Sequence, residues 1–454
     1  MPVSSTDTKR LPLVVLASAP ITGHCAPVMQ IAQAMVERGF EVIFMSSQEY
    51  KEQIEKIGAE WWECLSFPGS LEELQRLPPG LEKTILELEK FFLDATPSRS
   101  DGMRALLEKV RDRDADRDVV IVNETCSMAI LPFKYGAPLP KGYSEFPKVI
   151  NVNLVPLTVT SIDTAPFGPA LPPDSTSSGR ARNKLLNEMM FAGPMRHLND
   201  HLAKVLSECG CSSSPIGYFM DTWMSSYDCT LQLCSPSMEY PRSDLHPSIR
   251  YAGALPLRGL NPDFPLPSWW SEITANAALQ GKDRKKVIVV SQGTVSIDLS
   301  ELVVPTIRAF ANREDVIVVS ILGTKGATLP KDVETPANAH VIDYLPYDAI
   351  LPYADLFINN GGYGGVIHSV NNGVPMIVAG VSQDKAEMSA RCEYAGFAVN
   401  LCSQTPGSEA IYKGAEKIFK NKAYKLKAVR LQQENKDLDS LGIIEKQILA
   451  YAKK

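Results

Sequence analysis

Short apolar segments alternate with longer segments of helical periodicity along this chain, and the alternation occurs twice. We expect strands in the first half at residues 13–18, 41–46, 119–122 and 149–155. We expect strands in the second half at residues 287–290, 316–322, 341–342, 356–358 and 374–379. Strands buried on both faces are nearly continuous apolar runs, and alternating β and α segments are typical of parallel sheets. The pattern predicts an α/β chain with two doubly wound, Rossmann-like domains.

A proline-rich segment divides the two halves. Residues 256–270 carry prolines at positions 256, 262, 265 and 267, a density that suits neither a helix nor a central strand. A length of 454 residues accommodates two domains of ordinary size. We therefore predict a first domain at residues 1–255, a linker at 256–281, a second domain at 282–430 and a C-terminal helix at 431–454.

Charge and cysteine content exclude several classes of protein. The formal net charge of -6 provides no basic field, so nucleic acid is not an expected partner. Every apolar run falls well short of the roughly 18 residues that a membrane span needs. Nine scattered cysteines, odd in number and without a CxxC pair, indicate reduced thiols. We expect a cytoplasmic protein with no membrane span.

The stretch at residues 359–375, NNGGYGGVIHSVNNGVP, predicts a strand that turns sharply into a helix. Glycines in such a turn let the backbone approach an anion closely, and the helix start presents unpaired N–H groups to it. Asp384 and Lys385 follow the next expected strand, at the sheet edge where open α/β sheets bind ligands. The combination suits a charged sugar diphosphate. A tight strand-to-helix turn without a ligand is the structural alternative, because glycine motifs alone have many false positives.

Three histidines are candidates for chemistry. His24 follows the first expected strand and a glycine, so the fold places it at the carboxyl end of the sheet, where an imidazole could accept a proton near neutral pH. His197 and His201 are spaced i and i+4 on an expected helix, a spacing that can bind a metal. The sequence has no HExxH motif and no carboxylate pattern around them. We therefore expect a solvated helix face there and predict no metal site.

Residues 341–401 resemble the donor-binding signature of the family one glycosyltransferases, which use nucleotide sugars. The resemblance continues in four shorter motifs: ITGH at 21–24, PR at 241–242, YAG at 251–253 and SQGT at 291–294. It spans nearly the whole chain. It implies the GT-B fold, in which two Rossmann-like domains face each other across a cleft and the C-terminal helix packs back on the N-terminal domain.

The resemblance implies that His24 is the catalytic base. The family pairs this histidine with an aspartate at the position of Asn123, whose amide carries no negative charge. Glu124 is the next residue and could supply that charge, although adjacent residues at a strand end point in different directions. We expect Glu124 to be the charge partner and Asn123 to be an orienting group. The alternative is that Glu124 merely caps the following helix.

The resemblance also implies a donor-binding set. Tyr344 stands at the position of the aromatic residue that stacks on uracil, and Leu345 at the position that bonds to the base through its backbone. The chain departs from the family at Asn360, where a histidine meets the phosphate, and at His368, where a glutamate binds the ribose. The full expected set is Gly23, Gly293, Thr294, Tyr344, Leu345, Asn360, Gly361, Gly362, Gly364, Gly365, His368, Asp384 and Lys385.

The function implied by the resemblance is inverting transfer of a hexose, expected to be glucose, from a UDP-sugar to a hydroxyl of a small apolar acceptor. We expect no cofactor, no metal, and a monomer or weak oligomer. Two alternatives stay open. One is a nucleotide-sugar epimerase of the same fold, which would need further acid and base carboxylates in the cleft. The other is a non-catalytic accessory protein that binds nucleotide sugars, which the departures at Asn123 and His368 keep open.

Overall fold

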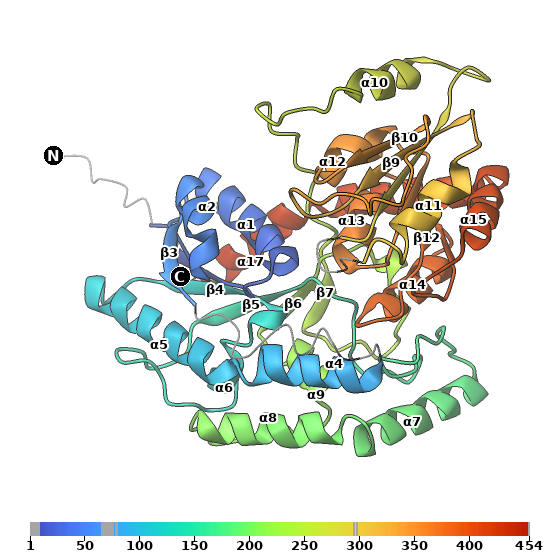
Figure 1. The fold of residues 1–454 in the computed structure, drawn as a ribbon. Helices are drawn as coiled ribbons and strands as arrows, with labels where there is room; N and C mark the ends of the chain where they lie inside the picture. The colour runs from blue at the N-terminus through green and yellow to red at the C-terminus, as the bar shows by residue number, and fades with distance from the viewer. Residues whose placement is uncertain (1–9, 65–76, 78–79, 294–295, 297, 453–454) are drawn as a thin grey trace.

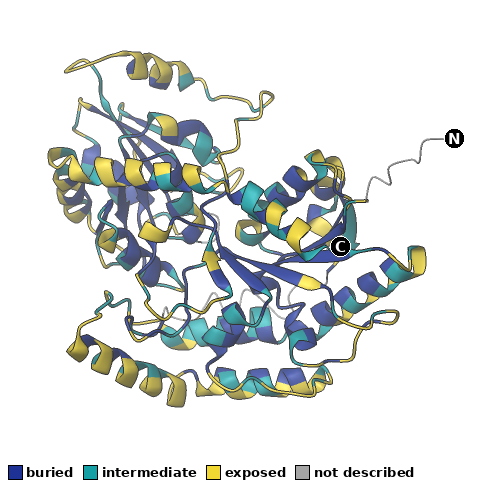
Figure 2. Cartoon of the chain, turned by 180° about the vertical axis from the view of Figure 1, so that it is seen from behind, coloured by how far each residue is buried: buried dark blue, intermediate teal, exposed yellow. Residues whose placement is uncertain are grey.

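A computed structural model of the chain contains two parallel sheets with helices on both faces (Figure 1). The structure describes residues 10–64, 77, 80–293, 296 and 298–452. Buried residues concentrate in the sheets and on the inner faces of the helices, whereas the outer helices expose one side (Figure 2). The predicted α/β fold class, with two Rossmann-like sheets, is confirmed.

The first sheet has the strand order β3-β2-β1-β4-β5-β6-β7, and every pair in it is parallel. Its strands are β1 (Leu13–Ala17), β2 (Val42–Ser46), β3 (Glu60–Glu63), β4 (Val119–Glu124), β5 (Lys148–Asn153), β6 (Cys229–Gln232) and β7 (Ile249–Tyr251). The longer helices around it are α1 (Thr22–Glu37), α4 (Leu81–Leu88), α5 (Thr96–Arg113), α7 (Ser177–Ala192) and α8 (Arg196–Glu208). The shorter helical segments are η1 (Gln48–Tyr50), α2 (Lys51–Lys56), η2 (Glu89–Leu93), η3 (Thr125–Ser127), α6 (Leu131–Lys134), α9 (Phe219–Ser225) and η4 (Pro236–Met238).

The second sheet has the order β10-β9-β8-β11-β12-β13 and is also parallel throughout. Its strands are β8 (Lys286–Ser291), β9 (Val316–Ile321), β10 (Ala339–Ile342), β11 (Leu356–Asn359), β12 (Met376–Val378) and β13 (Ala398–Asn400). Its helical segments are α11 (Val303–Phe310), α12 (Tyr347–Ile350), η5 (Leu351–Tyr353), α13 (Tyr363–Asn371), α14 (Lys385–Tyr394) and α15 (Ser408–Lys420).

Four strands were not expected from the sequence: β3, β6, β7 and β13. Each is only three or four residues long, and three of them lie at the edge of a sheet. Short strands with polar residues lack the continuous apolar run that marks a strand buried on both faces. Their pairing with longer neighbours, rather than their own pattern, defines them.

The chain passes between the sheets twice. The first crossing follows β7, and the predicted linker at 256–281 contains a helix that we did not expect, α10 (Trp270–Ala278). The second crossing lies between α16 (Ala423–Leu438) and α17 (Ser440–Tyr451). Helix α16 packs next to α13 of the second domain. Ile444 and Ile448 of α17 are buried in the core of the first sheet. The predicted terminal helix is therefore two helices, broken at Asp439, whose φ is 48°.

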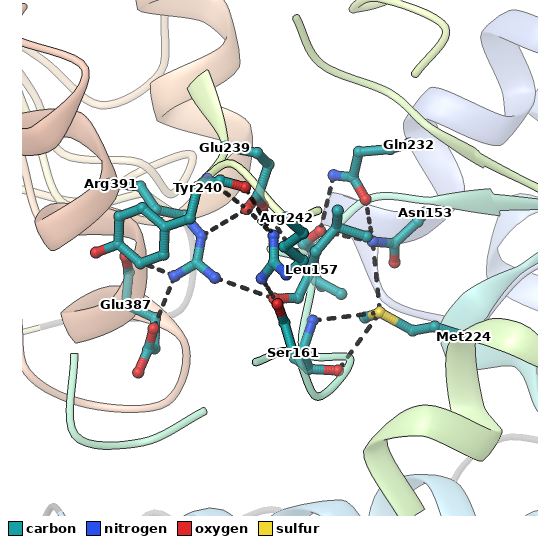
Figure 3. A network of polar contacts seen from close by, with 12 residues as sticks. Asn153, Leu157, Ser161, Met224, Gln232, Glu239, Tyr240, Arg242, Glu387 and Arg391 are labelled. Carbon is teal, nitrogen blue, oxygen red and sulfur yellow. Dashed lines mark hydrogen bonds and ion pairs between the residues drawn. The ribbon is translucent and has the colours of Figure 1, made fainter. Parts of the chain in front are cut away.

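A buried ionic network joins the two domains (Figure 3). Arg391 of α14 donates from Nε to Glu239 Oε2 at 2.9 Å and from Nη2 to the carbonyl of Leu157 at 3.0 Å, and both partners belong to the first domain. Arg391 Nη1 donates to Glu387 Oε2 at 2.7 Å. The other oxygen of Glu387 accepts from the first-domain amides of Gly168 and Ala170, each at 2.8 Å. The charges are paired and hydrogen-bonded, as buried charges must be.

Within the described residues, no helix combines the length and the apolar character that crossing a membrane requires.

Arg391→Leu should destabilise the protein strongly. The substitution leaves Glu387 buried without a guanidinium and leaves Glu239 only Arg242, so we expect the free energy of unfolding to fall by about 3–5 kcal/mol. Urea denaturation followed by circular dichroism measures the change. Arg113→Leu is the control, because Arg113 and Glu60 form an ion pair in contact with solvent. Equal losses in the two variants would contradict a structural role for the network.

Candidate active site

His24 lies in the first turn of α1, directly after β1. Its Nδ1 is 2.9 Å from Oε1 of Glu124, and the Glu124 side chain is fully buried. The carboxylate also accepts from the backbone amides of Cys126 at 2.8 Å and Ala19 at 3.1 Å. Three partners, the imidazole and two backbone amides, thus fix the position of one carboxylate. We assign the Nδ1 proton to the bond with Glu124, which leaves Nε2 as the free acceptor.

Strand geometry explains why Glu124, and not Asn123, meets His24. Side chains alternate between the faces of β4, and Val120 and Val122 face the core that also contains residues of α1. Glu124 shares that face, whereas Asn123 shares the opposite face with Ile121. The carboxylate therefore lies one residue later than in the family pattern, on the side of the sheet where α1 begins.

Asn123 has a different role from the one we expected. Its amide donates to Asn151 Oδ1 at 2.9 Å and to the carbonyl of Glu124 at 3.0 Å. Asn151 donates in turn to Thr125 Oγ1 at 3.0 Å. These bonds join the ends of β4 and β5, so Asn123 orients the strand end rather than the imidazole. Glu124 also caps η3 through Cys126, so the capping role and the contact with His24 occur together.

The electrostatics of the pair favour an ionised carboxylate and a basic imidazole. Burial acts to lower the pKa of His24, but the charge and hydrogen bond of Glu124 outweigh it, and the pKa is raised. Burial acts to raise the pKa of Glu124, but His24 and the two backbone amides lower it below the ordinary value. Asp384, from the second domain, further raises the pKa of His24. A carboxylate of the second domain therefore lies near enough to the imidazole to influence its protonation.

The glycine turn between β11 and α13 is as tight as the sequence suggested. Gly361 has φ 81°, and a Cβ atom there would come within 2.5 Å of Ser389 Oγ, so only glycine fits. Asn359 Oδ1 accepts from the amide of Gly361 at 3.0 Å, and Asn360 Oδ1 accepts from that of Gly362 at 3.3 Å. The turn thus satisfies its first two amides internally.

The backbone amides that are not bonded within the turn belong to residues 363–365, which follow Gly361 and Gly362 in the chain. The first intrahelical bond of α13 runs from Val366 to the carbonyl of Gly362, so the amides of Tyr363, Gly364 and Gly365 point out of the helix start. A Cβ atom on Gly364 would meet nothing within 4 Å, so that amide is approachable. An anion at this helix start would meet residues 363–365 rather than Gly361 and Gly362.

The side chain of Asn360 contacts the loop that follows β8. Asn360 Nδ2 donates to the carbonyl of Gln292 at 2.6 Å and to Ser296 Oγ at 3.2 Å, so both amide hydrogens are used within the protein. Gly293 has φ 75° and open space beside its Cα. Asn360 therefore positions this loop rather than directing an amide at a phosphate. Thr294, which we predicted beside the phosphate, lies outside the described residues.

Tyr344 and Leu345 precede α12. Tyr344 is 39% exposed, and the Lys325 ammonium lies over its ring, 5.9 Å from the centroid. Leu345 is buried. His368 Nδ1 is 2.7 Å from Asp348 Oδ1, and the ring packs against Tyr347. A carboxylate therefore lies beside His368. It belongs to Asp348 of α12, whereas in the family the glutamate stands at the position of His368 itself, on α13.

A small charged group surrounds Asp384. Lys385 is buried, and its Nζ donates to Gln383 Oε1 at 2.6 Å. Burial lowers the pKa of Lys385, whereas the charge of Asp384 acts to raise it. Burial raises the pKa of Asp384, whereas the charge of Lys385 acts to lower it. Glu87 of α4 approaches from the first domain: burial raises its pKa, and Gln383 and Lys385 counteract that rise.

Glu87, Gln383 and Asp348 were missed by sequence reasoning. Glu87 belongs to an ordinary amphipathic helix, so no local pattern distinguishes it. Gln383 carried a weak signal, because it directly precedes Asp384 and Lys385, which we expected at the site. Asp348 is four residues from Tyr344, but only the fold brings it to His368.

One group of possible metal ligands lies at this site. Ligand atoms of His24, Glu124 and Cys126 lie within 4.8 Å of one another. Burial raises the pKa of the Cys126 thiol well above its ordinary value, and neighbouring Glu124 adds to the rise. The Glu124 carboxylate already bonds to the His24 imidazole and to two backbone amides, an arrangement that suits proton transfer at the imidazole.

Comparisons with known proteins place these features in context. Residues 307–440 match the family described as Erythromycin biosynthesis protein CIII-like, C-terminal domain. The chain is 37% identical over 98% of its length to UDP-glucosyltransferase 1 of Beauveria bassiana (strain ARSEF 2860), covering 96% of that protein. It is 32% identical over 97% of its length to UDP-glucosyltransferase B1 of Starmerella bombicola, covering 99% of that protein. A solved structure of the glycotransferase of kitacinnamycin matches with a TM-score of 0.69 at 18% identity, covering 98% of this chain and 100% of that one.

NMR titration of the His24 imidazole tests the geometry directly. The raised pKa predicts a midpoint above the ordinary value of about 6.5. In Glu124→Gln the opposing charge is lost while burial remains, so we expect the midpoint to fall below that of the unsubstituted protein. The chain has six histidines, and a His24→Gln spectrum assigns the resonance. An unchanged midpoint in Glu124→Gln would contradict the pairing.

Proposed function

Because the chain belongs to the family one UDP-glycosyltransferases, we propose that His24 acts as its general base in an inverting transfer of glucose. The protein is a UDP-glycosyltransferase of the GT-B fold, and it transfers a sugar from a UDP-sugar to a small natural-product acceptor. The observation that carries the proposal is the buried Glu124 carboxylate on Nδ1 of His24, which leaves Nε2 as the ring nitrogen that can accept a proton.

In the proposed reaction, Nε2 of His24 takes the proton of an acceptor hydroxyl as its oxygen attacks the anomeric carbon. The new C–O bond forms on the face opposite the diphosphate, the bond to the diphosphate oxygen breaks, and UDP leaves with that electron pair. A single displacement inverts the anomeric carbon. Glu124 stabilises the imidazolium that results, because its carboxylate is ionised and 2.9 Å from Nδ1.

The leaving diphosphate needs stabilisation from the second domain. We propose that the amides of residues 363–365 at the start of α13 bind it, aided by the positive end of the helix dipole. Tyr344 offers an exposed ring for the uracil. Asp384 and Lys385 begin α14 beside the same cleft, where a carboxylate and an ammonium can bind sugar hydroxyls. This chain carries Lys385 where the family often has glutamine, so an ammonium replaces an amide at this position.

The acceptor side belongs to the first domain. Among the apolar residues of this domain, Trp223 and Met224 are core residues, whereas Met189 and Phe191 of α7 are exposed. Exposed apolar side chains suit a small apolar acceptor. The names of the similar proteins favour transfer over epimerisation, and the intact pair of His24 and Glu124 favours a catalytic protein over an accessory one.

His24→Ala should remove transfer while leaving donor binding intact. General base catalysis contributes roughly 10²–10⁴-fold, so we expect kcat to fall by at least about 10²-fold. UDP binding, measured by calorimetry, should be unchanged because the contacts proposed for the uracil and the diphosphate, at Tyr344 and residues 363–365, lie in the second domain. His246→Ala is the matched control, since His246 is exposed and bonded only locally, to Ser248. Loss of UDP affinity in His24→Ala would show that His24 belongs to the donor site instead.

UDP release with separate donors tests the reaction. We expect release from UDP-glucose that depends on a phenolic, sterol or terpenoid hydroxyl compound and yields a β-linked glucoside by NMR. UDP-galactose and UDP-N-acetylglucosamine should react more slowly. An α-linked product would contradict inversion, faster reaction of another donor would contradict glucose, and sugar isomerisation without an acceptor would indicate an epimerase.

A further inference from the structure

A second polar cluster lies in the first domain, away from His24. Helix α4 continues into η2, a π-helical turn, in which the amide of Asp94 donates to the carbonyl of Glu89 at 2.9 Å. This bond from i+5 to i brings residues five apart onto one side of the helix. Glu89 and Asp94 therefore present their carboxylates together, which an ordinary α-helical turn would not achieve.

Helix α8 presents a matching pair. His197 and His201 are one turn apart on α8, with ring centroids 6.1 Å apart. His197 Nε2 is 2.8 Å from Glu89 Oε2, and His201 Nε2 is 2.7 Å from Asp94 Oδ1. We expected no metal site here because the sequence around the two histidines has no carboxylate pattern. The structure supplies the carboxylates from about a hundred residues upstream.

The hydrophobic core fixes the register of the two pairs. Leu88 and Leu93 precede the two acids by one residue each, and both are buried in one cluster with α8. Leu198 and Leu202 follow the two histidines by one residue each and are buried in the same cluster. Leucines pack against leucines inside, and acids face histidines at the rim. The four polar side chains are therefore held together by packing, not only by their own attraction.

Lys90 shows that the cluster accommodates positive charge. Its Nζ lies 3.1 Å from Glu89 Oε1 and 2.9 Å from Asp94 Oδ2, between the two carboxylates. The side chain is 43% exposed, so its ammonium can move into water without rearrangement of the core. A divalent cation would then meet two carboxylates and two neutral imidazoles. The two negative charges of the carboxylates would balance the two positive charges of the ion.

We propose that Glu89, Asp94, His197 and His201 form a zinc site that joins η2 to α8. Ligand atoms of Glu89, Asp94 and His201 already lie within 4.8 Å of one another, and each comes from a separately anchored side chain. Imidazole nitrogen and carboxylate oxygen are zinc ligands, and four of them complete a tetrahedral site. His197, whose Nε2 is 2.8 Å from Glu89 Oε2, is 65% exposed and would complete the site by moving toward the other three ligands from the solvent side.

The site would stabilise one wall of the cleft. Glu87 lies two residues before Glu89 and interacts with Gln383 and Lys385 of the second domain. A zinc ion would hold η2, and with it the end of α4, against α8. This inference does not depend on the proposed catalytic role of His24, because binding of the metal can be measured without turnover.

The test is calorimetric titration of the full chain with ZnCl₂ after removal of bound metal with EDTA and dialysis. We expect one saturable site and a higher Tm with zinc, since a ligand of the native state stabilises it. His201→Ala should weaken binding by at least about tenfold, because loss of even an outer partner of a metal ligand costs about 10–100-fold. Lys90→Ala should bind zinc more tightly, because it removes the competing cation.

Matched variants separate this site from others. His340→Ala removes a histidine that faces a single carboxylate, Glu272, at 2.9 Å, and should leave zinc binding unchanged. His201→Ala retains all nine cysteines, so binding by thiols would persist in it. If His201→Ala fails to fold, His197→Gln at the exposed position replaces it. Absence of saturable binding in both the unsubstituted protein and Lys90→Ala, or equal binding in the histidine variants, overturns the proposal.

Discussion

The guanidinium of Arg391 determines how the two sheets face each other. It is buried, and it binds Glu239 and the carbonyl of Leu157 in one domain and Glu387 in its own helix. Because α14 begins at Lys385, anchoring Arg391 also places Asp384 at the cleft, where its charge acts on His24. An unpaired charge at this depth would be strongly unfavourable, so the domains are held at the one spacing that pairs every member. The geometry of the cleft follows from that requirement.

Within the first domain, the position of one carboxylate depends on strand alternation. Moving the acid from position 123 to position 124 transfers it to the other face of β4, and α1 begins on that face. Asn123 then takes over the bonds between strand ends. A change that looks like the loss of a catalytic partner in the sequence is a relocation in the structure.

Much of the fold and part of the candidate site could be predicted from the sequence. Long apolar strands, the glycine turn and His24 have local signatures, because burial on both faces, positive φ and strand ends impose residue types. The short strands β6 and β13, the internal bonds of Asn360, and the approach of Glu87 to Lys385 have none. The same holds for Glu89 and His197, which lie 108 residues apart and meet because η2 packs against α8. Contacts of this kind depend on packing between distant elements, which no local pattern records.

The two crossings between the domains lie side by side. The amide of Ala254, after β7, donates to Asn435 of α16, and Ser440 of α17 donates to the carbonyl of Ala254. Two adjacent covalent connections resist sliding and twisting of one domain against the other. They resist rotation less when the axis of rotation is the line that passes through both connections. The softest relative motion is therefore a hinge rotation about that line, resisted by the Arg391 network.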